Sequence, residues 1–561
     1  LGYVGLDGKR TGTKVEYDQD CTVTPSTSAA EIRDGSFLYL MNTEHGHMVH
    51  EIHEVPAANL RFDLELQPHE RWAVHFVVTP QTASEWPEMP DLAGSRVTLT
   101  TSDNSKFNDV LTQCRLDLDS LQTTFPHGSL PAAGIPWFVA PFGRDSLITS
   151  LQTLHIAPDR AIATIRTLAA LQGTRVDPER EEQPGKILHE MRYGEMARIG
   201  EVPHSPYYGS VDATPLWLWL VAECVIWTGQ AALIDELIPN IRAAIDWIDR
   251  YGDLDGDGLV EYRTDSEGVG HITHQVWKDS FDSLNHTDGT PALGPVAGVE
   301  VQGYVYAAYD RLARAASGHK ELAADLCRRA ERIRALIEEK FWLESEGLYA
   351  QALDGQKRAV ETPSSNPGHL LACSVPSPER AARMAHRFEQ ADFNSGWGIR
   401  TLSASSASYN PMSYHNGSIW PHDNSLIGYG LYRYGETATG HLVSTSLYDA
   451  AATMPMHRLP ELYCGFPRLG MALDAPIDYP VSCSPQAWAA GALPYLVRGM
   501  LGLEVDPETR ELVVDPAFPV WVNAITIHRL CVLGQEGTLT AYRTGEGYEV
   551  EATGLRVLRV E

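Results

Sequence analysis

A tryptophan beside two carboxylates could supply a proton to a leaving group. In the stretch QVWKDSFD, Trp277 lies close in sequence to Asp279 and Asp282. A carboxyl group that an aromatic ring screens from water has a raised pKa and keeps its proton near neutral pH, as a general acid must. The alternative is that one of the two aspartates caps a helix. The residue types alone do not decide which aspartate is the acid.

A further carboxylate, Glu461, lies in the stretch LPELYCGFPR, where prolines, a glycine and aromatic residues indicate a structured loop. Together with an acid from the first stretch, it would activate water as the second carboxylate of glycoside hydrolysis. The alternative is a surface ion pair with Arg468. Cys464 is a poor candidate nucleophile because the sequence places no base beside it.

Two stretches combine aromatic and polar residues in a way that suits sugar binding. They are PWFVAPFGRDS at 136–146 and YHNGSIWPHDN at 414–424. Rings cover the apolar face of a sugar, while carboxylates, amides and guanidinium groups bind its hydroxyls. The alternatives are a helix cap at Asp145 and simple packing around the second stretch. The predicted sugar contacts are Trp137, Phe142, Arg144, Asp145, His415, Asn416 and Trp420, with Trp277 and Asp282 from the first stretch.

An acidic loop at 253–261 is a candidate calcium site. Asp253, Asp255 and Asp257 occupy positions 1, 3 and 5 of a pattern that resembles the first half of an EF-hand loop, and Glu261 follows at position 9. The alternative is a polar turn that closes the preceding helix. We therefore expect at most a structural Ca²⁺ here, and no cofactor is required for catalysis.

The charge balance restricts the partners. The 561 residues carry a formal net charge of −29. Nucleic acid and anionic membranes would repel such a chain, whereas an uncharged oligosaccharide or glucan would not. The eight cysteines are widely spaced without a CxxC pattern, which favours reduced thiols and a cytoplasmic location. No apolar run reaches the length of a membrane span, the first residue is Leu1 rather than Met, and nothing indicates an oligomeric state.

Hydrophobic patterning divides the chain into three parts. Residues 1–103 contain alternating runs at 35–41, 60–66, 72–78 and 96–101, which predict an antiparallel β-sandwich. Residues 104–503 have helical periodicity, and residues 504–561 return to β patterning at 511–514, 524–528 and 547–551. The predicted helices are 107–122, 145–155, 158–172, 214–228, 231–250, 300–317, 319–341, 377–389, 418–434, 437–452 and 485–500.

In this order, the stretches resemble those of bacterial amylo-α-1,6-glucosidase-like proteins, relatives of the glucosidase part of glycogen debranching enzymes. FGRDS at 142–146 is similar to the Arg–Asp loop that holds the terminal glucose. VWKDS at 276–280, followed by VEVQGYVY at 299–306, resembles the stretch whose aspartate is the general acid. LPELYCG at 459–465, followed by SCSPQAWAAG at 482–491, resembles the stretch whose glutamate is the general base.

The resemblance implies a mostly α protein with an (α/α)6 barrel. It assigns the acid to Asp279 and the base to Glu461, and it adds Gln486 and Trp488 to the sugar contacts. The implied activity is inverting hydrolysis of α-glucosidic bonds, with α-1,6 bonds favoured. Because the chain has no room for a transferase barrel, the substrate would be a short branch or a free oligosaccharide. A sugar phosphorylase, a sugar epimerase that uses His415 and His422, and a non-enzymatic glycan-binding protein remain alternatives.

Overall fold

The computed structural model describes residues 98–263, 271–470 and 474–559, and the backbone of four short strands before them. The chain forms two compact units. The first consists of Leu1–Trp86 with Tyr193–Glu201, and the second of Pro87–Arg192 with Val202–Glu561.

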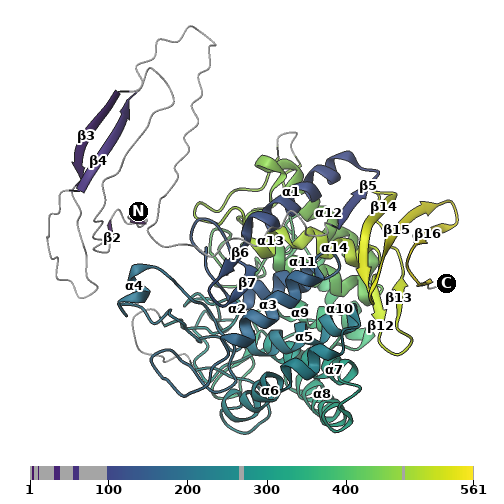
Figure 1. The fold of residues 1–561 in the computed structure, drawn as a ribbon, viewed down its shortest axis with the longest axis horizontal. Coiled ribbons are helices and arrows are strands. Elements are labelled where there is room, and N and C mark those ends of the chain that lie inside the picture. The colour runs from purple at the N-terminus through teal and green to yellow at the C-terminus, as the bar shows by residue number, and fades with distance from the viewer. Residues whose placement is uncertain are drawn as a thin grey trace. The chain divides into compact units, whose positions relative to one another are not determined.

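The second unit is rich in helices (Figure 1). Every helical range predicted from the sequence contains a helix, and Gly491 divides the last range into α13 and α14. The helices are α1 Ser105–Leu121, α2 Gly143–Thr153, α3 Pro158–Ala170, α5 Ala213–Thr228, α6 Ala232–Trp247, α7 Val299–Ala315, α8 Lys320–Lys340, α9 His369–Cys373, α10 Pro378–Phe388, α11 Pro421–Arg433, α12 Thr437–Thr453, α13 Ala487–Ala490 and α14 Ala492–Met500. A π-helical turn, Ile248–Gly252, extends α6, and the short helix α4, Glu195–Arg198, belongs to the first unit.

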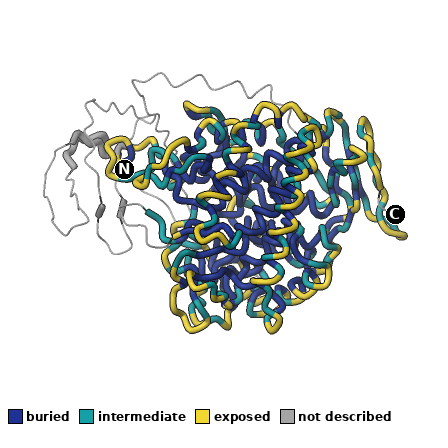
Figure 2. Tube along the Cα trace, turned by 90° about the horizontal axis from the view of Figure 1, so that it is seen from below, coloured by how far each residue is buried: buried dark blue, intermediate teal, exposed yellow. Residues whose placement is uncertain are grey.

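Contacts between helices run in a closed ring. In order, α2 packs against α5, α5 against α7, α7 against α9, α9 against α11, α11 against α14, and α14 against α2. Further helices pack outside: α3 and α6 on α5, α8 on α7, α12 on α11 and α1 on α14. The sequence explains this layering, because α5 is apolar on all sides and its residues from Ala213 to Trp227 are buried, whereas α8 buries only a stripe. The buried residues fill the interior of the helical part (Figure 2).

The C-terminal part forms two sheets beside the helices (Figure 1). One is antiparallel, in the order β16 Gly547–Thr553, β15 Gln535–Thr544, β14 Ala524–Val532 and β5 Leu99–Ser102. The other joins β12 Glu504–Asp506, β13 Glu511–Val514 and β17 Val557–Arg559. The run 96–101, which we assigned to the N-terminal sandwich, thus contributes β5 to the C-terminal sheet, where Thr101 pairs with Thr526. Periodicity identifies a strand but not its partner.

Two antiparallel pairs are described in the first unit: β1 Tyr3–Val4 with β2 Arg10–Thr11, and β3 Glu31–Phe37 with β4 Val55–Arg61. Strands β3 and β4 overlap the predicted runs at 35–41 and 60–66. The run at 72–78 lies outside the described residues. The N-terminal sandwich and the three domain boundaries therefore stay predictions. The remaining strands are β6 Gln122–Phe125, β7 Gly128–Pro131, β8 Ala297–Gly298, β9 Trp342–Leu343, β10 Leu348–Tyr349 and β11 Ala352–Leu353. Within the described residues, no helix has the length and apolarity needed to cross a bilayer.

Candidate active site

Several residues of the site lie in the first turn of a helix or just before it. Arg144 and Asp145 lie in the first turn of α2, and Asp212 precedes α5. Trp420 and Gln486 are the residues immediately before α11 and α13. Helix N-termini carry partial positive charge, so these positions favour carboxylates.

Gly143 allows α2 to begin here. A Cβ atom at this position would lie 1.9 Å from the carbonyl oxygen of Leu188, so no larger residue fits. The backbone N–H of Gly143 donates to the carbonyl oxygen of His189 at 2.8 Å. This close approach sets the direction of the first turn and thereby positions Arg144 and Asp145.

Arg144 links two aspartates from distant segments. Its side chain is 3% exposed, and its Nη1 and Nη2 atoms each lie 2.9 Å from a carboxylate oxygen, Oδ2 of Asp212 and Oδ2 of Asp279. Asp212 is fully buried, whereas 30% of the Asp279 side chain remains exposed. Asp279 is therefore held by a buried cation but can still be reached from solvent.

Burial raises the pKa of Asp279 to about 6, although Arg144 opposes the shift. The negative charges of Asp212 and Glu190 raise it further. Trp277, which the sequence placed next to the acid, is part of a cluster of rings. It is 1% exposed and packs among other rings, stacked on His369 at 5.7 Å between ring centroids and edge-on to His415 and Trp420.

Glu461 is 2% exposed and accepts two hydrogen bonds. The hydroxyl of Tyr414 donates to Oε1 at 2.5 Å, and the backbone N–H of Cys483 donates to Oε2 at 2.9 Å. Burial raises the pKa of Glu461 to about 7, the charge of Asp279 adds to the shift, and both hydrogen bonds oppose it. Tyr414 is not among the site residues predicted from the sequence, although it is the first residue of the YHNGSIWPHDN stretch.

Asp145 is the third carboxyl group of the cluster. It is 6% exposed, and Nε2 of Gln486 donates to its Oδ1 at 3.4 Å. Burial raises its pKa to about 7, Arg144 opposes this, and the charges of Glu461 and Asp279 contribute to the increase. The structure thus brings together Asp145, Asp279 and Glu461, and each negative charge makes ionisation of another member less favourable.

His415 and Asn416 fix the turn that follows Asp279. The Nδ1 atom of His415 lies 2.8 Å from Oγ of Ser280 and accepts a hydrogen bond from the Ser280 N–H at 3.4 Å. Asn416 donates from Nδ2 to the carbonyl oxygen of Asp282 at 2.7 Å. These contacts give both residues a positioning role.

The remaining predicted contacts form a mostly buried aromatic wall. Trp420 stacks on His415 at 5.1 Å, and Trp488 stacks on His422 at 3.8 Å between ring centroids. Phe142 is 8% exposed. Trp137 is only half-buried, and its indole N–H donates to the carbonyl oxygen of Val481. Among the predicted rings, Trp137 is therefore the one best placed to meet a ligand.

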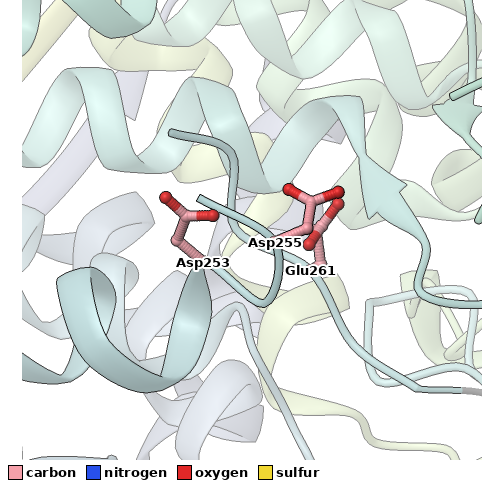
Figure 3. Close-up of side chains that lie close together, drawn as sticks. All are labelled: Asp253, Asp255 and Glu261. Carbon is pink, nitrogen blue, oxygen red and sulfur yellow. The ribbon is translucent and has the colours of Figure 1, made fainter. Parts of the chain in front are cut away.

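The acidic loop after α6 brings the side chains of Asp253, Asp255 and Glu261 close together (Figure 3). Carboxylate oxygens of Asp253, Asp255 and Glu261 lie within 4.8 Å of one another. However, Nζ of Lys357 lies 2.9 Å from carboxylate oxygens of both Asp255 and Asp257 and also pairs with Glu261. Asp255 and Glu261, two of the three possible calcium ligands, already pair with Lys357. Calcium would therefore have to displace this ammonium group. Calcium binding therefore stays a prediction.

Comparison with known proteins identifies the chemistry. A family model described as "Mannosylglycerate hydrolase MGH1-like glycoside hydrolase domain" matches residues 143–463, more than half of the chain. The chain belongs to this glycoside hydrolase family. The matched range contains Asp145, Asp279 and Glu461, so the whole carboxyl cluster lies inside the glycoside hydrolase domain.

Solved structures show the same fold at low sequence identity. A mannosylglycerate hydrolase of family GH63 from Thermus thermophilus, in complex with Tris and D-glycerate, is 15% identical with a TM-score of 0.51, and the alignment covers 69% of this chain and 100% of that one. A "Sialidase" is 11% identical with a TM-score of 0.60, over 82% of this chain and 40% of that chain. A GH78 rhamnosidase from a Bacillus species is 14% identical with a TM-score of 0.55, over 82% and 42%. The chain thus spans about two fifths of the latter two proteins.

No curated protein matches the chain. The comparisons support a helix-rich glycosidase that acts on a carbohydrate, and they do not extend to the amylo-α-1,6-glucosidase type that the motifs resemble.

Proposed function

We propose that the protein is an inverting glycoside hydrolase that cleaves α-glucosidic bonds, α-1,6 bonds foremost, in oligosaccharides or short branches derived from glucans. The observation that carries the proposal is a pair of carboxyl groups, the partly exposed Asp279 and the buried Glu461, whose pKa values are raised to about 6 and about 7 while separate partners hold them. Two such carboxyl groups are what hydrolysis of a glycosidic bond requires.

Asp279 is the proposed general acid. Arg144 occupies its Oδ2 atom, which leaves Oδ1 to carry a proton toward the glycosidic oxygen. With a pKa of about 6, a useful fraction of Asp279 is protonated near neutral pH.

Glu461 is the proposed general base. Tyr414 and the Cys483 N–H both donate to it, and donors of this kind stabilise the ionised form that removes a proton from water. When Asp279 carries its proton, the negative charge that raises the pKa of Glu461 is gone. The protonated acid therefore favours the ionised base.

Arg144 and Asp145 are proposed to bind the hydroxyls of the sugar at the nonreducing end, with Gln486 beside them. A neutral substrate fits the described part of the site best. The carboxyl groups there are Asp145, Asp212, Asp279, Glu461 and Glu190, and they outnumber the nearby cations Arg144, Arg192, Lys186 and Lys278 by one. A glycerate aglycone carries a carboxylate, which these groups would repel.

We also propose that the closed ring α2–α5–α7–α9–α11–α14, with its outer helices, is an (α/α)6 barrel and that the site lies at the end where these helices begin. The free cysteines among the described residues support the proposed cytoplasmic location.

The test is hydrolysis of a substrate panel in phosphate-free buffer. It contains α-1,6- and α-1,4-linked glucose disaccharides, an α-mannoside and a glycosylglycerate, and free sugar is measured. Release of glucose from the α-1,6-linked disaccharide supports the proposal. Turnover only after addition of phosphate would indicate a phosphorylase, and turnover of the glycosylglycerate alone would replace the substrate assignment.

A further inference from the structure

Phe281 is an exposed ring beside the proposed acid. Its side chain is 77% exposed, whereas Phe142, Trp277, Trp420 and Trp488 are nearly buried. Phe281 lies two residues after Asp279, so their Cα atoms are at most about 7 Å apart. A single exposed apolar residue is common on protein surfaces. A role for Phe281 in binding must therefore follow from the residues around it.

The turn that carries Phe281 is fixed on both sides. The N–H of Ser283 donates to the carbonyl oxygen of Ser280 at 3.1 Å, and the Ser283 hydroxyl donates to the carbonyl oxygen of Lys278. On the same turn, Ser280 contacts His415, and the carbonyl oxygen of Asp282 accepts from Asn416 and Asn285. Buried residues therefore hold the backbone of the turn that carries Phe281 in place.

The position next to the acid determines which part of a substrate the ring can meet. A general acid donates its proton to the glycosidic oxygen, and this oxygen departs with the leaving group. The leaving-group sugar therefore lies beside Asp279, whereas the nonreducing-end sugar lies against Arg144 and Asp145. An aromatic ring on the acid's own turn is therefore close enough to meet the leaving-group sugar.

The neighbours of Phe281 suit a sugar. Asp282, the next residue, is partly exposed and offers a carboxylate to hydroxyl groups. The charge of Asp282 acts on the partly exposed Tyr479, whose ring lies 5.7 Å from that of Tyr414 between centroids. Tyr414 in turn binds Glu461, so this edge of polar groups and rings extends from the acid to the base.

We infer that Phe281 forms the floor of a leaving-group subsite, where its ring stacks on the apolar face of the sugar that departs. The inference rests on the proposed function and adds a residue that selects substrates with a sugar as the leaving group.

The experiment compares two substrates in Phe281→Ala and the wild-type protein. One is the best disaccharide from the panel, and the other is the glycosyl fluoride of the same nonreducing-end sugar, whose leaving group has no face to stack on. We expect kcat/KM for the disaccharide to fall about tenfold, which corresponds to about 1.4 kcal/mol, and kcat/KM for the fluoride to stay within about twofold. Phe281→Trp should retain the disaccharide activity.

Leu293→Ala is the matched control, because Leu293 is also an exposed apolar residue, at 67%, and its carbonyl oxygen accepts a hydrogen bond from the N–H of Gly355, which is not a proposed site residue. It should change neither substrate. An equal loss on both substrates in Phe281→Ala, or no loss on the disaccharide, would overturn the subsite. Failure of the wild-type protein to hydrolyse any glycosyl fluoride or disaccharide would instead overturn the proposed function, and the subsite with it.

Discussion

Two clusters of carboxyl groups in this molecule differ in how their charge is balanced. In the loop after α6, the ammonium of Lys357 pairs with Asp255, Asp257 and Glu261. In the active-site cluster, Arg144 pairs with Asp279 and Asp212, while Glu461 accepts hydrogen bonds only from neutral donors.

The difference appears in the pKa values. In the loop, Lys357 lowers the pKa of Asp255, whereas burial raises the pKa of Glu261 although Lys357 opposes the shift. In the active-site cluster, burial raises the pKa values of Asp145 and Glu461 to about 7 and that of Asp279 to about 6. A cluster that a cation neutralises stabilises the fold, whereas one that is buried with too little positive charge holds protons that can be transferred.

The largest expected fall in activity follows the loss of a carboxyl group that transfers a proton. Asp279→Asn and Glu461→Gln should each reduce kcat by at least about 100-fold, because acid and base catalysis commonly contribute that much. Steady-state kinetics on the best disaccharide would measure it, with circular dichroism to show that the fold is intact.

Azide distinguishes the two roles. In Glu461→Ala, azide should occupy the place of the water and give a glycosyl azide of inverted configuration. If azide restores Asp279→Ala in this way and leaves Glu461→Ala inactive, the two assignments must be exchanged. If Asp279→Asn is fully active and Asp282→Asn is not, the acid is Asp282.

A smaller loss is expected for the third carboxyl group. Asp145→Asn keeps the size of the side chain but removes the charge that binds sugar hydroxyls, so kcat/KM should fall about tenfold or more on every substrate. Unchanged affinity and rate would show that Asp145 only begins α2.

Lys357→Met tests the neutralised cluster. It leaves Asp255, Asp257 and Glu261 without their shared cation, and we expect a stability loss of about 2 kcal/mol, read from urea unfolding. Calcium should restore part of it in the variant, while EDTA should leave the melting temperature of the wild-type protein unchanged. Lys320→Met, on α8, is the control. A wild-type melting temperature that falls in EDTA would show instead that calcium takes the place of the Lys357 ammonium group in the loop.

The smallest expected effect is a shift of the pH profile. The Tyr414 hydroxyl stabilises ionised Glu461, so Tyr414→Phe should raise the pKa of the base. Because the base must be ionised, the acidic limb of the profile of kcat/KM should move to higher pH by roughly half a unit to one unit. A loss of rate that is equal at every pH would assign Tyr414 a purely structural role.

The sequence predicted the helices well because their apolar periodicity is local; β13, Glu511–Val514, also matches the predicted strand. It could not predict partners that come from far along the chain. Lys357 is 96 residues from Glu261, and β5 pairs with a strand more than 400 residues later. The charge pattern of the acidic loop indicated a cation but could not show that Lys357 pairs with these carboxylates.

For the candidate site, too, the sequence indicated individual residues but not their partners. The residue types pointed to Glu461 and to Asp279 or Asp282, because glycoside hydrolysis requires two carboxyl groups, and the family resemblance selected Asp279 and supported Arg144. They did not show that Asp212 shares Arg144, that Tyr414 binds Glu461, or that His415 and Asn416 hold the turn after the acid. These contacts depend on how the starts of separate helices meet in the folded ring.

The most direct test of the paired acid and base is the configuration of the first product. Proton NMR of the wild-type reaction on an α-linked disaccharide, recorded before mutarotation, would show which anomer of the released sugar forms first. An inverting mechanism gives the β-anomer first, because water activated by Glu461 attacks the face opposite to the bond that Asp279 protonates. Initial release of the α-anomer would contradict it.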